Sequence, residues 1–148
     1  MPDTPLHIRR CRRTDFIDVM RLLGDDDAPA AVPEKRTLRR FRGIVNDLGV
    51  DLYLAVVDGE LAGLVHVTYA RQLADGPRAE IGRLVVGRSF RRQGVGTALI
   101  ELARQRAIRR GCVMLSCSVP KGNNDAGAFL EKVGLSPDGS IFVQELKS

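Results

Sequence analysis

The spacing of hydrophobic positions predicts one strand and two helices in the first third of the chain. Leu6 to Arg10 predicts a short strand, and Thr14-Asp15 then supplies an N-cap for an amphipathic helix that we expect to end at Gly24. A turn-rich connector, Asp25 to Pro33, leads to a second segment with helical spacing, Glu34 to Leu48.

Three β-rich segments follow, and the first two predict a hairpin. Asp51 to Val57 and Glu60 to Tyr69 are separated only by Asp58-Gly59. This dipeptide is typical of a type I′ turn, because both central positions of that turn need a positive φ. After a loop, Ala79 to Val86 predicts a further strand.

A long helix and another strand come next. The helix is expected from Gly94 to Arg110, where apolar residues recur on one side. Val113 to Val119 predicts a strand, and we expect it at the centre of the sheet because its residues are nearly all apolar or small.

The C-terminal segment predicts a short helix and a strand-forming tail. Asn123 or Asn124 can cap a helix over Asp125 to Val133, and Ile141 to Val143 predicts one or two closing strands. A hairpin followed by strand, helix, strand and helix predicts an α/β protein with a mixed sheet and helices packed on it.

Length and composition fit one domain, residues 1–148. With 148 residues, 44% of them hydrophobic, the chain has no room for a second core. The apolar runs are too short to cross a bilayer, and no apolar segment follows Met1 to Pro5 as a signal peptide requires. We therefore expect a cytoplasmic protein that does not associate with membranes.

The three cysteines, Cys11, Cys112 and Cys117, lack the paired short spacings of a zinc site, so we expect no metal. We interpret them as free thiols. A nucleophilic role for Cys117 is disfavoured, because no local cysteine signature surrounds it and only His7 and His66 are available as bases.

The formal net charge of +5 and the pI near 9.6 raise the question of nucleic-acid binding. The basic residues occur in several short clusters, and the chain has no Trp and only two Tyr and five Phe to stack on bases. We therefore expect no nucleic-acid partner. A basic surface suits a phosphate-rich cofactor or an acidic substrate equally well.

Two glycines, Gly94 and Gly96, mark the start of the long predicted helix. A helix N-terminus offers backbone N–H groups without partners and the positive end of a dipole, which together suit a pyrophosphate. A bare G-x-G is a weak signal, since glycines are common in turns. The spacing matches neither the G-x-G-x-x-G of dinucleotide-binding folds nor the G-x-x-x-x-G-K-[ST] of nucleotide P-loops.

Leu84 to Gly96 resembles motif A of the GNAT superfamily of N-acetyltransferases, a strand followed by R/Q-x-x-G-x-G/A at a helix start. Asn123 to Leu135 is similar to the N-x-x-A-x-x-F-Y-x-K-x-G-F helix of that family, and Leu6 to Leu23 looks like its opening. The resemblance implies a splayed central mixed sheet with helices on both faces. Acetyl-CoA would lie between two diverging strands, Ala79 to Val86 and Val113 to Val119.

The resemblance also implies roles for particular residues. Backbone groups along the strand would hold the pantetheine arm, and N–H groups of the loop and helix start would hold the pyrophosphate. The implied cofactor-binding residues are Leu84, Val85, Val86, Arg91, Arg92, Gln93, Gly94, Val95, Gly96, Thr97, Asn123 and Phe129. For catalysis, the Val86 N–H would polarise the thioester carbonyl, and Glu80 would act as the base, through water. Alternatively, Glu80 only pairs with Arg78 or Arg83.

One position departs from the family pattern. Leu130 stands where relatives commonly have a Tyr that protonates the departing thiolate, and leucine donates no proton. Three explanations stay open: water protonates the thiolate, another donor such as Ser118, Tyr69 or Tyr53 serves, or the protein binds acetyl-CoA without efficient catalysis. His66 is a further candidate acid or base, although a lone strand histidine is more often structural.

The acceptor is expected to be a primary amine on a small molecule. The acceptor pocket would draw on Asp25 to Asp27, Arg39 to Arg42 and Arg71 to Arg78. The aspartates would attract a cationic amine, whereas the arginines would hold an acidic one. The alternatives are a protein N-terminus or lysine as acceptor, and a non-catalytic acetyl-CoA-binding regulatory module. A homodimer is left open.

Overall fold

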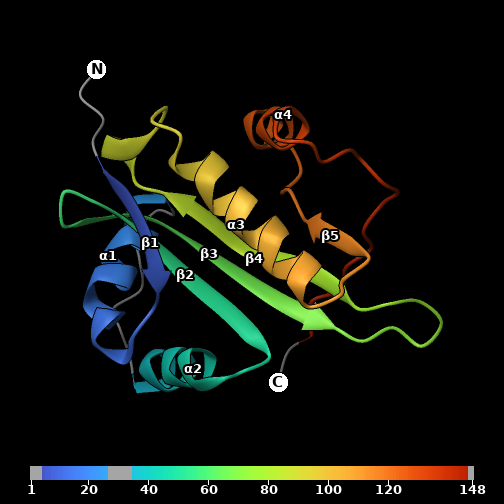
Figure 1. The fold of residues 1–148 in the computed structure, drawn as a ribbon, viewed down its shortest axis with the longest axis horizontal. Coiled ribbons are helices and arrows are strands. Elements are labelled where there is room, and N and C mark those ends of the chain that lie inside the picture. The colour runs from blue at the N-terminus through green and yellow to red at the C-terminus, as the bar shows by residue number, and fades with distance from the viewer. Residues whose placement is uncertain (1–4, 27–34, 147–148) are drawn as a thin grey trace. The chain divides into compact units, whose positions relative to one another are not determined.

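Five strands form one sheet in the order β1-β2-β3-β4-β5 (Figure 1). The computed structural model describes residues 5–26 and 35–146. The strands are β1 (Leu6–Arg10), β2 (Val50–Val57), β3 (Glu60–Ala70), β4 (Arg78–Val86) and β5 (Met114–Cys117). The first three pairs are antiparallel, and β4 and β5 are parallel. The expected mixed sheet is therefore confirmed.

The chain divides into two compact units, residues 1–118 and 119–148. The first unit holds the whole sheet, and the second holds α4 (Asn124–Lys132). No helix in the described ranges is long and apolar enough to cross a membrane. Those ranges also contain no group of three or more metal-ligating side chains that could hold an ion.

The hairpin between β2 and β3 follows from its two turn residues. Asp58 has a φ of 51° and Gly59 a φ of 78°. Both values lie in the left-handed region that a type I′ turn requires, and aspartate and glycine tolerate it best. The predicted hairpin is confirmed.

Two helices pack against one face of the sheet. They are α1 (Phe16–Asp26), which follows the short 3-10 helix η1 (Arg13–Asp15), and α2 (Lys35–Asn46). The hydrophobic core on this face joins side chains of both helices to strand residues, namely Val19, Leu22, Phe41, Leu54, Leu64 and Val85. These contacts fix the helices because the apolar stripe of each can be buried only against the sheet.

The predicted end of the first helix is wrong, because α1 continues through Gly24 to Asp26. A glycine inside a helix costs only about 1 kcal/mol, which packing of the helix can offset. Asp15 does form a capping contact at the start of η1, just before α1. Its carboxylate accepts a hydrogen bond of 2.7 Å from the Arg12 N–H. Residues 27–33 of the expected connector lie outside the described residues.

The long helix α3 (Val95–Arg109) packs on the opposite face, along β3 and β4 (Figure 1). Gly63 permits this close packing. A Cβ at Gly63 would lie 2.8 Å from the Val85 carbonyl oxygen, 3.0 Å from Val95 Cγ1 and 3.1 Å from Leu99 Cδ1. The sheet therefore has helices on both faces, as expected.

Two predictions at the end of the chain are wrong. β5 covers only Met114–Cys117 and lies at the end of the strand order, not at the centre. Its run of apolar and small residues fits an edge strand equally well, and Met114 is 39% exposed. The expected closing strands are absent from the described tail, where Ile141 and Phe142 are 68% and 93% exposed.

The final helix is confirmed within the second unit. The Asn123 side chain caps α4 by accepting a hydrogen bond of 3.1 Å from the Ala126 N–H. The chain then turns at Gly134, whose φ is 105°.

Candidate functional site

The first feature of the candidate site is an open edge of β4. β5 pairs with β4 only from Arg78 opposite Met114 to Ile81 opposite Cys117. Beyond Ile81, the part of the chain that the structure describes provides no strand beside Gly82 to Val86 on that edge. The backbone groups of this part of β4 are therefore not paired with a strand of the described residues on that edge, and an extended ligand could pair with them.

The backbone of β4 points its polar groups into this opening at alternate residues. The Val85 carbonyl faces β3, since it lies beside Gly63, and the Gly87 N–H donates to the Ala62 carbonyl at 2.8 Å. Successive strand residues direct their backbone groups to opposite edges. Leu84 and Val86 therefore present N–H and C=O groups to the open edge, while Val85 turns its own toward β3.

The second feature is the N-terminus of α3, which follows β4. Its N-cap is Gly94, with a φ of 82°, and no side chain caps it. The Ala98 N–H makes the first intrahelical bond, to the Gly94 carbonyl at 3.0 Å. The N–H groups of Val95, Gly96 and Thr97 thus have no acceptor within the helix, and together with the helix dipole they suit an anion.

The loop before this helix is held to the end of β4. The Arg91 Nε donates to the Val86 carbonyl at 3.4 Å, and the Gln93 amide donates to the Ser89 carbonyl at 3.2 Å. Arg92 has a φ of 64°, which is uncommon for a residue other than glycine. The loop residues Arg91, Arg92, Gln93 and Gly94 are all exposed, so their groups are accessible to a ligand.

Glu80 and His66 lie on the face of the sheet that carries α1 and α2. Leu64 packs in the core on that face, and His66 and Thr68 follow it at alternate positions of β3. Glu80 is exposed and lies directly opposite Thr68. Its side chain makes no hydrogen bond or ion pair within the ranges 5–26 and 35–146, and therefore no pair with Arg78 or Arg83.

A β-bulge lies between these two residues. His66 pairs with Arg83 but Val67 pairs with Ile81, so β4 carries one extra residue, Gly82. A Cβ at Gly82 would lie 3.5 Å from His66 Nδ1. The His66 Nε2 is buried without a hydrogen-bond partner in the described structure, and burial lowers the pKa of the imidazole. His66 is therefore neutral near pH 7.

The three thiols are poor nucleophiles. Burial raises the pKa of Cys11 to about 12 and also raises the pKa of Cys112. Burial and, after it, the nearby charge of Glu80 raise the pKa of Cys117. Since a thiolate is the reactive form, the cysteines do not form the catalytic centre.

Asn123, Phe129 and Leu130 belong to the second unit. Asn123 is exposed at the start of α4, and Leu130 is 8% exposed. The proposed contacts of Asn123 and Phe129 with a cofactor therefore stay predictions.

Sequence reasoning missed two residues that shape the site. Gly63 sets the distance between α3 and the sheet, and Gly82 forms the bulge beside Glu80. A glycine inside a strand is the signal that could have revealed both, because it often marks a bulge or a close approach of another element.

Comparison with known proteins identifies the family. The sequence model of the acetyltransferase (GNAT) family matches residues 17–135. An acetyltransferase of Photorhabdus laumondii is 32% identical over 131 residues, which cover 86% of this chain and 85% of that protein. N-alpha-acetyltransferase 30 of Dictyostelium discoideum is 27% identical over 112 residues, 75% of this chain but only 60% of that protein.

Solved structures share the fold. A transcriptional regulator from Bacillus halodurans is similar with a TM-score of 0.88 at 26% identity, over 96% of this chain and all of that one. Glucosamine-6-phosphate N-acetyltransferase from Arabidopsis thaliana is similar with a TM-score of 0.82 at 19% identity, over 97% of this chain and 99% of that one.

Proposed function

The chain belongs to the acetyltransferase (GNAT) family and is an N-acetyltransferase, and we propose that it transfers the acetyl group of acetyl-CoA to a primary amine on a small molecule. The observation that carries this proposal is the continuity of two features. The open edge of β4 at Leu84 and Val86 leads directly to the uncapped N-terminus of α3.

The β4 edge and the α3 N-terminus follow one another in the same order as the pantetheine arm and the pyrophosphate of acetyl-CoA. An extended pantetheine arm has amide groups that can pair with a strand edge, and the groups of Leu84 and Val86 face the opening. The pyrophosphate, which carries negative charge, suits the N–H groups of Val95, Gly96 and Thr97 at the helix start. Arg91 and Arg92 are exposed beside it and add positive charge.

The chemistry requires a neutral amine. An ammonium loses its proton, by way of water, to the Glu80 carboxylate, and the amine nitrogen then attacks the thioester carbonyl carbon. A C–N bond forms, the C–S bond breaks, and the electron pair leaves on the sulfur. The nitrogen then releases its second proton to water, which balances the proton that the thiolate takes up. The Val86 N–H, which faces the open edge, stabilises the oxyanion that develops on the carbonyl.

The leaving group needs no tyrosine in this scheme. Leu130 offers no proton, but a thiol has a pKa near 8.5, so coenzyme A can depart as a thiolate and take its proton from water. His66 is neutral on the same face as Glu80 and is a second candidate for proton transfer.

A small-molecule acceptor is supported by the fold relative that acts on glucosamine-6-phosphate. Two other functions have a specific observation behind them. The Dictyostelium relative is named an N-alpha-acetyltransferase, which favours a protein N-terminus as acceptor. The Bacillus structure is named a transcriptional regulator, which favours a regulatory module that binds acetyl-CoA without turnover.

Thiol release from acetyl-CoA in the presence of an amine library tests the proposal. We expect release with at least one small amine, among aminosugars, polyamines and amino acids, and mass spectrometry should find the acetylated product. Turnover only with peptides that carry a primary N-terminus would establish the protein acceptor instead. Tight acetyl-CoA binding with no turnover on any amine or peptide would establish the regulatory module.

A further inference from the structure

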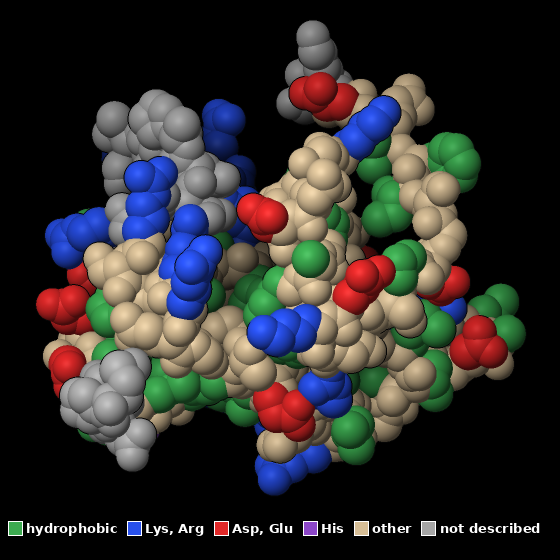
Figure 2. Space-filling view, turned by 90° about the horizontal axis from the view of Figure 1, so that it is seen from above, with side chains coloured by type: hydrophobic (Ala, Val, Ile, Leu, Met, Phe, Trp, Pro, Cys, Tyr) green, Lys and Arg blue, Asp and Glu red, His purple; other side chains and the backbone are tan. Residues whose placement is uncertain are grey.

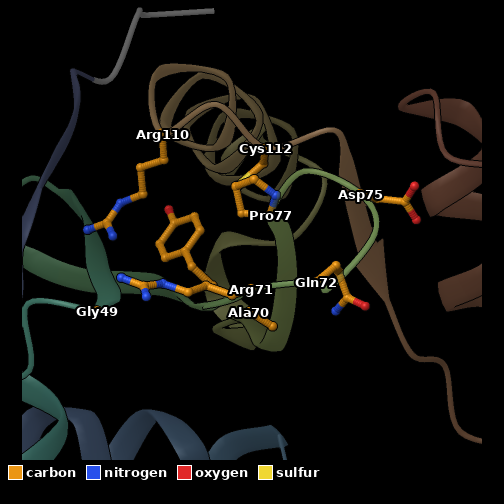
Figure 3. Close-up of a pocket in the computed structure, with 9 residues that line it drawn as sticks. Gly49, Ala70, Arg71, Gln72, Asp75, Pro77, Arg110 and Cys112 are labelled. Carbon is orange, nitrogen blue, oxygen red and sulfur yellow. The ribbon is translucent and has the colours of Figure 1, made fainter.

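A pocket of about 600 Å³ lies at the end of α3 opposite to the acetyl-CoA site. It is bordered by the end of β3, the loop between β3 and β4, and the C-terminal end of α3. Two arginines, Arg71 from the loop and Arg110 from the helix end, line it together with Tyr69, Pro77 and Cys112 (Figure 3). We propose that this pocket is a second site, which binds a small organic oxyanion, a phosphate ester or a carboxylate, through Arg71 and Arg110.

The pocket is separate from the acetyl-transfer site. Helix α3 spans Val95–Arg109, so its two ends are roughly 20 Å apart at 1.5 Å per residue. Tyr69 also points to the face that carries α3, since its hydroxyl donates to Asp51, which Arg106 of α3 reaches as well. Glu80 lies on the other face. We expected Arg71 to Arg78 at the acceptor pocket, but Arg71 lines a pocket on the face opposite to Glu80, the proposed base. A ligand there would not lie against Glu80.

Arg110, which lines this pocket, belongs to a cluster with an excess of positive charge. Arg10, Arg106 and Arg110 all form ion pairs with the single carboxylate of Asp51, at 3.0, 3.0 and 3.5 Å. Three guanidinium groups share one carboxylate, so two positive charges are not neutralised within the cluster. Arg110 makes the longest of these contacts and is the one that lines the pocket.

Arg110 is held in place by neutral groups in addition to Asp51. Its Nη2 donates to the Leu48 carbonyl at 3.0 Å, and its guanidinium lies 4.1 Å from the centre of the Tyr69 ring. These contacts fix the position of the side chain but do not cancel its charge. A preorganised cation loses little entropy when it binds an anion.

Arg71 supplies the second cation. It is exposed, and it has no hydrogen bond or ion pair with any residue in the described part of the chain. Figure 3 shows the guanidinium groups of Arg71 and Arg110 on the same side of the pocket. Two guanidinium groups on one side of a pocket suit an oxyanion. Arg71 can donate two parallel hydrogen bonds, whereas Arg110, whose Nη2 already donates to Leu48 and Asp51, can donate from Nη1.

Two features oppose anion binding and are outweighed. Asp75 lines the pocket, but in Figure 3 its carboxylate lies on the far side and points away from both arginines. The C-terminal end of α3 carries about half a negative charge, which the charges of the lining residues Arg71 and Arg110 exceed even when Asp75 is counted. The apolar surfaces of Pro77, Cys112 and the Tyr69 ring leave space for the organic part of the ligand.

Calorimetry with inorganic phosphate at constant ionic strength tests the proposal. The variant Arg71→Ala removes one ligand-binding cation from an exposed loop, so it is expected to fold. The matched control is Arg109→Ala, which removes an equal charge from an exposed position at the C-terminal end of α3 but does not line the pocket. We expect Arg71→Ala to weaken phosphate binding about tenfold, the size of one charge-assisted hydrogen bond, and Arg109→Ala to change it less than twofold.

Phosphate can also bind at the start of α3, so the titration is repeated with Gly94→Val and with saturating acetyl-CoA. If the second site exists, one phosphate-binding component persists in Gly94→Val and with saturating acetyl-CoA, and only Arg71→Ala weakens it. This result would stand even if acetyl-CoA did not bind. The proposal is overturned if Arg71→Ala and Arg109→Ala have equal effects, or if acetyl-CoA abolishes all phosphate binding.

Discussion

The Asp51 carboxylate on β2 accepts two hydrogen bonds from the Arg106 guanidinium on α3, at 3.0 and 3.3 Å, and so joins the sheet to the helix whose N-terminus is the proposed acetyl-CoA site. Asp51 is 1% exposed and also accepts a hydrogen bond of 2.5 Å from the Tyr69 hydroxyl. Burial alone would raise its pKa, but the bonds from Arg106 and Tyr69 outweigh burial and lower it.

Replacing this carboxylate should destabilise the fold strongly. In Asp51→Asn, three arginines lose the carboxylate that they share, and their charges are left without compensation at a buried position. We therefore expect a loss of about 3 kcal/mol in the free energy of unfolding. Urea unfolding followed by circular dichroism measures it. The control is Asp58→Asn in the exposed hairpin turn, where asparagine also tolerates the positive φ. A loss below about 1 kcal/mol for Asp51→Asn would contradict the structural role of this cluster.

His66 should make stability depend on pH. Burial lowers its pKa below the ordinary 6.5, so below that pH the unfolded chain binds more protons than the folded one. The contribution to stability is therefore complete above pH 6.5 and is lost as the pH falls. In His66→Phe, which removes the titrating ring, we expect a flatter decline of the free energy of unfolding between pH 6.5 and 5. His7→Phe on the exposed start of β1 is the control, and equal slopes in all three proteins would contradict this assignment.

Gly63 should tolerate no side chain. A Cβ there would meet the Val85 carbonyl at 2.8 Å and the side chains of Val95 and Leu99 at 3.0 and 3.1 Å. We expect Gly63→Ala to lower the free energy of unfolding by about 2 kcal/mol and to weaken acetyl-CoA binding, because the start of α3 must move. Gly43→Ala in α2 is the matched control, since its Cβ meets nothing within 4 Å. Thermal unfolding measures the stability of both variants, and calorimetry measures their affinity for acetyl-CoA. Equal stability of the two variants would show that α3 can shift to accommodate a Cβ at Gly63.

Glu80→Gln tests the proposed base. A general base contributes about 100-fold or more to the rate, and its contribution matters most where the amine is protonated. We therefore expect the variant to lose about 100-fold in kcat/KM at pH values below the pKa of the amine, and less above it. Glu60→Gln, in the exposed hairpin, should keep the wild-type profile. A Glu80→Gln profile that matches the wild type would remove Glu80 from the mechanism.

Local signals predicted much of the fold. The Asp58-Gly59 pair determines its hairpin without tertiary help, because both residues have the positive φ that the turn demands. The start of α3 was also predicted from the sequence, because Gly94 and Gly96 mark it, and Gly94 is the N-cap in the structure. These features depend on residues that are adjacent in the sequence.

Features that depend on distant residues were not predictable. Asp51 was read only as the first residue of a strand, although its partners Arg10, Tyr69 and Arg106 come from three other elements. No periodicity links these positions. The apolar and small residues of Val113 to Val119 also gave no information on the place of β5 in the sheet, because an edge strand and a central strand can have the same composition.

Calorimetric titration of acetyl-CoA into the wild type, Gly94→Val and Gly59→Val tests the central claim most directly. Gly94 and Gly59 have φ values of 82° and 78°, and a Cβ at either would meet nothing within 4 Å, so both substitutions introduce similar backbone strain. Only Gly94→Val puts a side chain beside the N–H groups at the start of α3. We expect wild-type affinity in Gly59→Val and a loss of about tenfold or more in Gly94→Val, since the valine obstructs the close approach of a pyrophosphate. Equal affinity in all three proteins would contradict the placement of acetyl-CoA at this helix.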